Sequence, residues 1–151
     1  MKQEKNRRTL ERFLPMQVRA VEEGEDNRVF ELSFSSEEPY MRWFGPEILD
    51  HSGEACDLSR LQELGVVLFN HDRNAVLGKI TRAWIEDNRG KAEIAFDDDE
   101  FAETIRKKVA GGTLRGVSVG YRVDSWEEVT AGDTSADGRF TGPCSIARRW
   151  L

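Results

Sequence analysis

The stretch Arg115-Gly116-Val117-Ser118-Val119-Gly120-Tyr121 decides between two folds for this chain. Its Gly-x-Ser-x-Gly pattern is typical of the strand–turn–helix elbow that carries the nucleophile in α/β-hydrolases. That fold places its serine before the acid and the histidine in chain order. Here both histidines, His51 and His71, precede Ser118, and a helix-like stretch lies before the serine rather than after it. We therefore interpret Ser118 as a strand residue between two glycines, served by a histidine from an earlier strand.

That histidine follows a continuous apolar run. Val66-Val67-Leu68-Phe69 predicts a buried strand that delivers Asn70 and His71 to its end. A serine hydroxyl is a poor nucleophile without a base, and histidine, with an ordinary pKa of about 6.5, suits that task. We assign Ser118 as the candidate nucleophile and His71 as the candidate general base. The pair then has to meet on one face of neighbouring strands.

Around this pair the hydrophobic pattern changes period. Alternating positions predict a hairpin of strands near 16–20 and 30–34, and a second hairpin that turns at Asp87-Asn88-Arg89-Gly90. Between the two hairpins, residues 36–54 contain several Pro and Gly residues, which interrupt regular secondary structure, so this segment is expected to be irregular. A short helix is expected from a cap at Asp57 to Leu64.

A longer helix follows the second hairpin. Phe101, Ile105 and Val109 recur at helical spacing, and Asp97 with Glu100 resembles a capping box. Strands are expected from Leu114 to Val129, and a flexible loop over 131–142. These elements predict an α+β fold, a mostly antiparallel β-barrel or sandwich with one central helix and one short helix.

Composition narrows the class of protein. The chain has 151 residues, a net charge of −6 and 38% hydrophobic residues, which predicts one domain over 13–151 behind a flexible basic tail at 1–12. Acidic charge argues against nucleic acid as a specific partner, because phosphate binding needs a basic surface. No apolar run approaches the roughly 20 residues that span a bilayer, so no membrane partner is expected. Cytosolic synthesis is the expectation.

The two cysteines argue against a disulfide-stabilised fold and against a zinc site. Cys56 and Cys144 make no disulfide framework and are expected to be reduced. With the histidines they lack the paired spacing of structural zinc sites, so we assign no metal and no cofactor. Cys56 is an alternative nucleophile without a base that the sequence identifies.

The motifs in order resemble one family. Val67-Leu68-Phe69-Asn70-His71-Asp72, Leu77-Gly78-Lys79-Ile80, the acid-capped helix to Val109, and the Ser118 stretch together are similar to the prohead (head-maturation) serine proteases of tailed bacteriophages. These enzymes are similar in fold to the herpesvirus assemblins, so the resemblance implies a herpesvirus-protease-like fold. It maps the catalytic histidine onto His71 and the serine onto Ser118.

The resemblance also implies a role. Such enzymes act without a cofactor inside the immature capsid of a phage or prophage. This capsid assembles in the cytoplasm of the bacterial host. They cut the scaffold, or scaffold-like segments of the major capsid protein, and themselves. Family members continue past a pair such as Arg149-Trp150 into a strand that often carries the third catalytic group. We therefore expect this 151-residue form to be truncated, weakly active, and prone to self-association through an unpaired edge.

Three alternatives for the third group stay open at this stage: Asp72, His51, or a residue beyond the end of the chain. Asp72 can reach the His71 ring only if the strand has ended there, since adjacent strand residues point to opposite faces. His51 lies in a stretch expected to be solvated. Two rival functions stay open as well. They are a non-catalytic β-barrel module that binds scaffold or capsid, and a Ser-His esterase.

Overall fold

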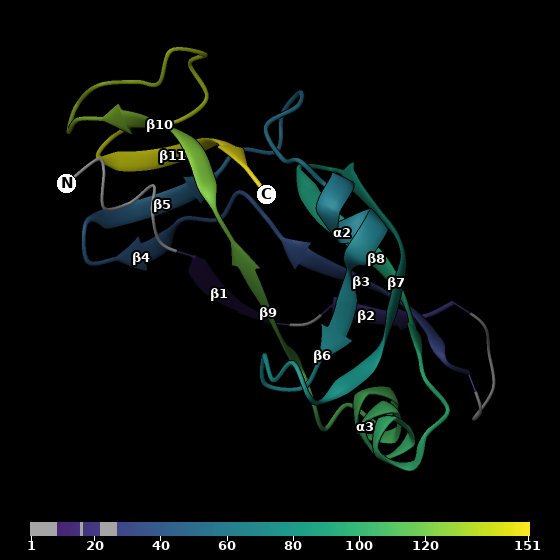
Figure 1. The fold of residues 1–151 in the computed structure, drawn as a ribbon. Helices are drawn as coiled ribbons and strands as arrows, with labels where there is room; N and C mark the ends of the chain where they lie inside the picture. The colour runs from purple at the N-terminus through teal and green to yellow at the C-terminus, as the bar shows by residue number, and fades with distance from the viewer. Residues whose placement is uncertain (1–8, 16, 22–26) are drawn as a thin grey trace.

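The computed structural model describes residues 9–15, 17–21 and 27–151 (Figure 1). Within these ranges the chain is mostly strand. The elements, in chain order, are β1 (Leu10–Pro15), β2 (Gln17–Ala20), β3 (Val29–Ser35), β4 (Tyr40–Arg42), β5 (Gly45–Leu49), α2 (Ser59–Leu64), β6 (Val66–Leu68), β7 (Val76–Glu86), β8 (Arg89–Phe96), α3 (Glu100–Ala110), β9 (Gly116–Tyr121), β10 (Val123–Val129) and β11 (Cys144–Trp150).

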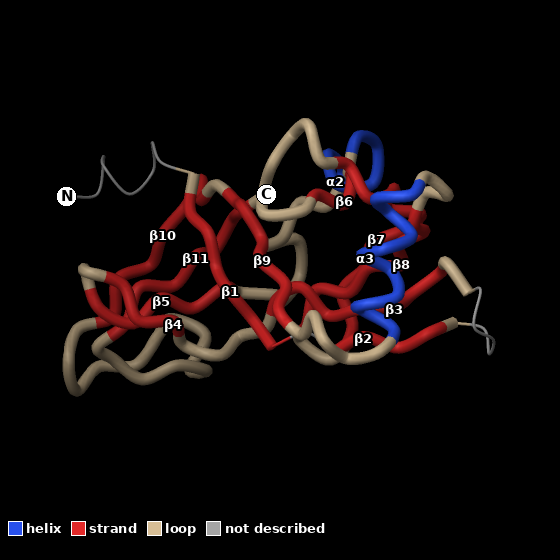
Figure 2. Tube along the Cα trace, turned by 90° about the horizontal axis from the view of Figure 1, so that it is seen from below, coloured by secondary structure: helices blue, strands red, loops and turns tan. Residues whose placement is uncertain are grey.

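The strands form three sheets. The largest has the order β2-β3-β8-β7-β6, a second has the order β10-β11-β5-β4, and β1 pairs with β9 alone. Figure 2 shows the β1–β9 ribbon running between the two larger sheets. All described pairings are antiparallel except β11 with β5, which is parallel. This arrangement confirms the α+β class.

A closed barrel is a wrong prediction. The segment from Leu114 to Val129 forms two strands that separate at Arg122, so that β9 pairs with β1 whereas β10 pairs with β11. Among the described strands none bridges β6, at the edge of the large sheet, to β9. The sheets therefore stay open, and the gap between them becomes important for the site.

The two predicted hairpins are confirmed. β2 pairs with β3 and β7 pairs with β8, with Asp87 and Asn88 at the second turn. Both turn residues have φ above +50°, as a two-residue type I′ turn requires. Met16, part of the first predicted strand, lies outside the described residues, as do residues 1–8. β1 begins at Leu10, inside the segment expected to be a tail.

The expectation of irregular structure over 36–54 is wrong in part. β4 and β5 occupy this segment, and β5 joins the second sheet between β11 and β4. Gly45, the first residue of β5, has a φ of 108° and follows the turn of the β4–β5 hairpin. The Pro and Gly residues of this segment did not by themselves predict the hairpin. The parallel partner of β5 is almost a hundred residues away along the chain, too distant for local patterns to indicate.

Both helices are present, and both have other N-cap residues than predicted. The cap of α3 is Asp99, whose carboxylate accepts from the backbone N–H of Ala102, and not Asp97. Gly111 ends the helix as predicted. The N-cap of α2 is Leu58 and not the predicted Asp57, although the Asp57 carboxylate accepts from the backbone N–H of Ser59. Neither described helix is long and apolar enough to span a membrane.

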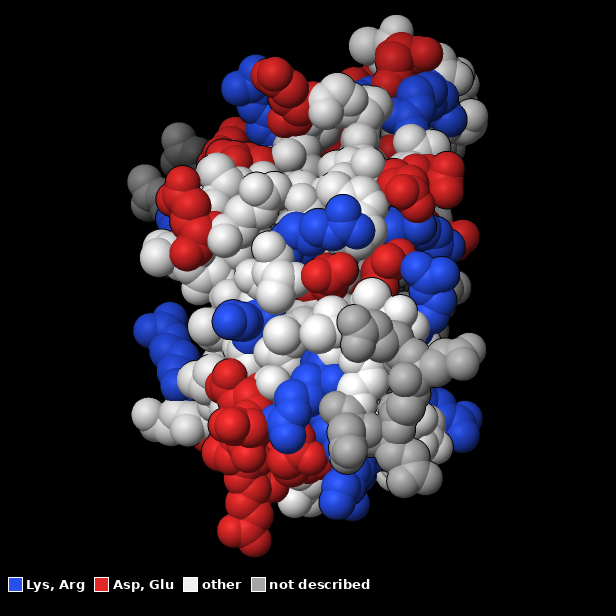
Figure 3. Space-filling view, turned by 90° about the vertical axis from the view of Figure 1, so that its right-hand side faces the viewer, with Lys and Arg blue, Asp and Glu red and all other residues white. Residues whose placement is uncertain are grey.

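One main core joins the pieces. Its larger buried members include residues of the large sheet, of α3, of β5 and of β9 to β11: Phe30, Leu32, Phe34, Leu49, Leu77, Ile94, Phe96, Ile105, Tyr121, Val123 and Trp150. Most charged side chains lie at the surface, with exceptions such as Arg12 and Glu47. Figure 3 shows both signs interspersed there, with acids gathered at the end where α3 lies in Figure 1. The β1–β9 ribbon is thus fixed by the core on one face only.

Candidate active site

Ser118 lies in the middle of β9, directly opposite Phe13 of β1. Side chains alternate along a strand, so Val117, Val119 and Tyr121 point to one face, where they pack against the core. Ser118 points to the other face. The sequence interpretation of a strand serine between glycines is therefore confirmed by the backbone.

His71 does not lie on a strand. β6 ends at Leu68, and a tight loop closes where Phe69 N–H donates to the carbonyl of Ala75 at 3.0 Å. Asn70 and His71 both have positive φ, 53° and 56°. Asp72 N–H donates to the Phe69 carbonyl oxygen, so these two residues form the centre of a tight turn, with φ values like those at Asp87 and Asn88. Asn and His adopt positive φ more readily than most other residues. The loop itself is anchored, because the Phe69 ring packs edge-on against Phe101 of α3.

The two side chains meet across the gap between sheets. His71 Nε2 lies 2.7 Å from Ser118 Oγ, within hydrogen-bond distance. The predicted pair is thus brought together, from the loop after β6 and from β9. The expectation of neighbouring strands is wrong, since β6 and β9 belong to different sheets. The expectation of a buried strand at Val66 is also wrong: β6 is an edge strand, and Val66 is 47% exposed.

A cavity of about 550 Å³ opens beside the pair. Both His71 and Ser118 line it. Its other walls are largely apolar and come from the large sheet, from α3 and from the β1–β9 ribbon, as with Leu32, Ile94 and Ile105. Its volume falls in the range of roughly 300–1,000 Å³ that is usual for ligand pockets. The serine and histidine therefore sit at the mouth of a space that another molecule can enter.

The third group is not identified among the described residues. Asp72 is adjacent in sequence, but its carboxylate accepts from the backbone N–H of Asn74 at 2.8 Å. In the described ranges Ser118 is the single hydrogen-bond partner of the His71 ring. His51 is engaged elsewhere, as follows.

His51 belongs to a second serine–histidine pair. Its Nε2 lies 2.7 Å from Ser35 Oγ, and its Nδ1 lies 2.8 Å from the carbonyl oxygen of Leu49. The expectation that this histidine is solvated is wrong: it is 3% exposed and packs edge-on against Trp150. Burial lowers the pKa of His51 and outweighs the backbone hydrogen bond that favours its charged form. Sequence reasoning missed Ser35, which no local motif marks.

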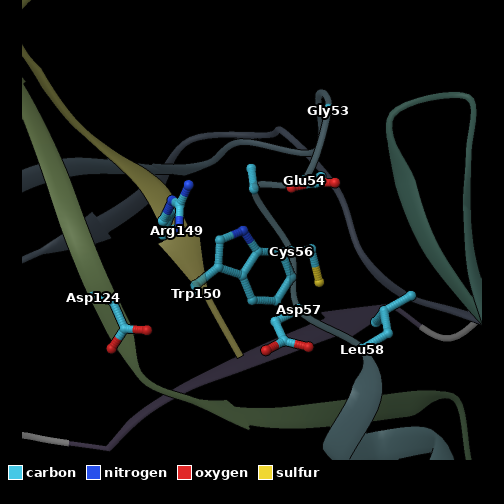
Figure 4. Close-up of a pocket in the computed structure, with 9 residues that line it drawn as sticks. Gly53, Glu54, Cys56, Asp57, Leu58, Asp124, Arg149 and Trp150 are labelled. Atoms are coloured by element: carbon cyan, nitrogen blue, oxygen red, sulfur yellow. The ribbon is translucent and has the colours of Figure 1, made fainter.

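Cys56 lines a different pocket, of about 430 Å³, between the loop before α2 and the end of β11 (Figure 4). Burial raises the pKa of its thiol to about 12, so the thiolate is scarce at neutral pH. Both described histidines have other partners. The geometry therefore gives Cys56 no base, and both cysteines are free of disulfides.

A buried ionic cluster holds the inner face of the ribbon. Arg12 of β1 donates to the Glu47 carboxylate at 2.8 Å and to the Glu47 carbonyl oxygen at 2.8 Å. The Tyr121 hydroxyl donates to the same carboxylate, and burial raises the pKa of Tyr121 to about 12. Arg12 and Glu47 are 1% and 0% exposed. The cluster ties the strand of Ser118 to β5 of the second sheet.

No group of three or more His, Cys, Asp or Glu side chains with metal-binding geometry occurs in the described part of the chain. What the arrangement offers chemically is a hydroxyl hydrogen-bonded to an imidazole. That combination defines a candidate serine hydrolase site on an α+β scaffold.

Comparison with known proteins places the chain more narrowly. A family model described as Caudovirus prohead serine protease matches residues 15–140. The chain belongs to this family, as its motifs predicted.

A curated relative is the major capsid protein of Halomonas phage phiHAP-1, which is 39% identical over 94 residues. That match covers 60% of this chain but 16% of the relative, so the chain corresponds to a small part of that protein. No solved structure matches. The predicted likeness to the herpesvirus assemblins therefore stays a prediction.

Proposed function

We propose that this protein is a serine endopeptidase of phage capsid maturation, with Ser118 as nucleophile and His71 as general base. The observation that carries the proposal is the 2.7 Å contact between His71 Nε2 and Ser118 Oγ at the mouth of an apolar cavity. Family membership supports the same chemistry.

In the proposed reaction, Ser118 Oγ attacks the carbonyl carbon of a peptide bond while its proton passes to His71 Nε2. His71 then gives this proton to the nitrogen of the leaving amine, and the C–N bond breaks. Water, activated by the same imidazole, hydrolyses the resulting ester and returns the free hydroxyl. No metal or cofactor takes part in this route.

For substrates, we propose the scaffold protein and scaffold-like segments of the major capsid protein, with self-cleavage as a further reaction. The family description and the name of the phiHAP-1 relative support this choice. Action on such substrates places the enzyme inside the immature capsid, within the bacterial host cytoplasm.

The test combines labelling and cleavage. A small fluorophosphonate, which reacts with activated serines whatever their substrate, should label the wild type at Ser118 and should not label the variants Ser118→Ala or His71→Gln. Capsid and scaffold proteins of the same phage, incubated with wild type, should be cut, and Ser118→Ala should leave them intact.

The rival functions give other results. A non-catalytic capsid-binding module would bind these proteins without labelling or cleavage. An esterase would label and would hydrolyse a p-nitrophenyl ester, but would leave capsid and scaffold proteins whole. Either pattern would overturn the proposed protease function.

A further inference from the structure

Two glycines flank Ser118 on its own face of β9. Gly116 and Gly120 are two residues before and after the serine, so all three share one face of the strand. A Cβ at Gly116 would meet nothing described nearer than the Leu14 carbonyl oxygen at 4.0 Å, and one at Gly120 nothing nearer than Thr9 Cγ2 at 3.8 Å. Neither glycine has a positive φ. Larger residues would therefore fit both positions.

Other strand glycines are different. A Cβ at Gly78 would lie 2.2 Å from the Ala95 carbonyl oxygen, and one at Gly90 would lie 2.3 Å from Ser35 Oγ. Those two glycines are required by packing inside the protein, whereas Gly116 and Gly120 are not. Glycine within a strand weakens it, and commonly marks the close approach of a ligand or of another backbone. The open face around Ser118 thus points to a molecule outside the described chain.

The surroundings define the chemistry of that molecule. Phe13, opposite Ser118 in the register of β1 and β9, is 67% exposed and lines the cavity mouth together with Val66. The cavity behind them has largely apolar walls, in which an unpaired charge would be costly to bury. β6 and β9 each leave one strand edge unpaired among the described strands, and such an edge can bind an extended peptide.

We propose that the substrate is an extended polypeptide whose backbone crosses Gly116 and Gly120, with a large apolar side chain in the cavity against Phe13. That side chain belongs to the residue that contributes the carbonyl group of the cleaved bond. The inference rests on the proposed protease function and adds its substrate preference. Aliphatic and aromatic residues fit this pocket, whereas lysine and aspartate do not.

A panel of peptidyl phosphonates tests the preference. The probes share one peptide and differ in the residue beside the phosphonate: Phe, Leu, Ala, Lys or Asp. We expect the Phe and Leu probes to label Ser118 at least about tenfold faster than the Lys and Asp probes, because an apolar pocket does not compensate a buried charge. Equal rates across the panel, with the small fluorophosphonate still reacting, overturn this inference and leave the protease function standing.

Larger side chains at Gly116 and Gly120 test the path of the substrate backbone. Gly116→Val and Gly120→Val should slow peptidyl-probe labelling at least about tenfold more than small-probe labelling, since an added side chain obstructs the longer molecule. Ser125→Val, at an exposed position of β10, is the matched control and should change neither rate. Circular dichroism verifies folding of each variant. If the folded glycine variants behave like Ser125→Val, the proposed path is wrong.

If the glycine variants do not fold, Phe13→Ala tests the proposed pocket. Phe13 is largely exposed, so its loss should leave the core unaffected. Loss of an aromatic contact worth about 0.5–1.5 kcal/mol should reduce the Phe-over-Ala probe preference by about two- to tenfold. An unchanged preference overturns the role of Phe13 and with it the proposed pocket. Failure of the small fluorophosphonate to label wild type would instead count against the protease function itself.

Discussion

The molecule contains two serine–histidine pairs whose hydrogen bonds are equally long, but one pair lines a cavity and the other is buried. His71 with Ser118 and His51 with Ser35 both have an imidazole Nε2 at 2.7 Å from a serine Oγ. The first pair lies at the mouth of a cavity, between a tight turn and a strand of another sheet. The second is enclosed in the core, with Ser35 0% exposed.

The second ring nitrogen separates the two pairs further. His51 Nδ1 faces the Leu49 carbonyl oxygen, so both nitrogens of the buried ring have partners within its own surroundings. For His71 the described residues supply a partner to Nε2 alone. A satisfied imidazole joins elements of a fold, whereas a proton shuttle needs access to substrate and water. Hydrogen-bond length is equal in the two pairs, so access to substrate and water is what distinguishes the candidate catalytic pair from the buried one.

The largest expected difference between the pairs is in turnover. Ser118→Ala removes the nucleophile and should reduce cleavage of the proposed substrates by a factor on the order of 10⁶. Ser35→Ala should leave the rate per folded molecule within about twofold, because the buried hydroxyl contacts no cavity-lining catalytic group. Single-turnover cleavage, normalised to the folded fraction, measures both. A loss of turnover in folded Ser35→Ala comparable to that in Ser118→Ala would remove the distinction.

A second expected effect concerns the support beneath Ser118. Glu47→Gln removes the charge that faces Arg12, and leaving one charge of a buried pair costs about 3–5 kcal/mol of stability. Glu31→Gln is the matched control, because its partner Arg19 is 76% exposed, and such surface pairs contribute about 0–1 kcal/mol. Urea unfolding of both variants makes the comparison. Equal losses would mean that the cluster does not anchor the ribbon.

Local patterns predicted much of this fold because they act over few residues. The alternation in β3 and β8, the turn at Asp87-Asn88 and the stop at Gly111 are each encoded within a turn or a strand. The candidate pair was also predictable, since a strand serine between glycines and a histidine after an apolar run are each recognisable alone.

Contacts between distant segments were not predictable in this way. Ser35 and His51 meet only because β3 and the residues after β5 converge, and Phe13 faces Ser118 only through the register of β1 with β9. The hydrophobic period of a strand states which residues are buried, but not which strand is its partner. The parallel pairing of β5 with β11 and the open sheets follow from partner choice, which the sequence pattern leaves undetermined.

A third, smaller effect separates the pairs by stability. Ser35→Ala leaves the buried Nε2 of His51 without its partner, which should cost about 1–3 kcal/mol. Ser125→Ala, an exposed strand serine, is the control and should stay within about 0.5 kcal/mol of wild type. Denaturant midpoints provide the measurement. If Ser35→Ala is as stable as the control, the buried hydrogen bond does not contribute to the fold.

The smallest expected effect is a pH dependence that belongs to the buried pair alone. Burial lowers the pKa of His51 below its ordinary value of 6.5, so the unfolded chain binds a proton at this residue before the folded protein does. Between the lowered pKa and 6.5 the unfolded state holds more protons, and stability therefore falls as pH decreases through this window. Above 6.5 the contribution is complete. Three charged groups face His51: Glu37 and Asp50 favour its charged form, whereas Arg12 opposes it, and burial outweighs their combined effect.

The measurement is the urea midpoint of wild type, His51→Gln and His71→Gln at several pH values from about 7.5 down to about 5.5, the range over which an ordinary histidine titrates. The decline with decreasing pH should be present in wild type and in His71→Gln, since both keep the buried imidazole. It should flatten in His51→Gln, which cannot titrate. Turnover per folded molecule should be lost in His71→Gln and kept in His51→Gln, because only His71 contacts the candidate nucleophile. If wild type and His51→Gln lose stability equally as pH decreases, burial of His51 does not make stability depend on pH. The contrast between the two pairs would then rest on access to substrate alone.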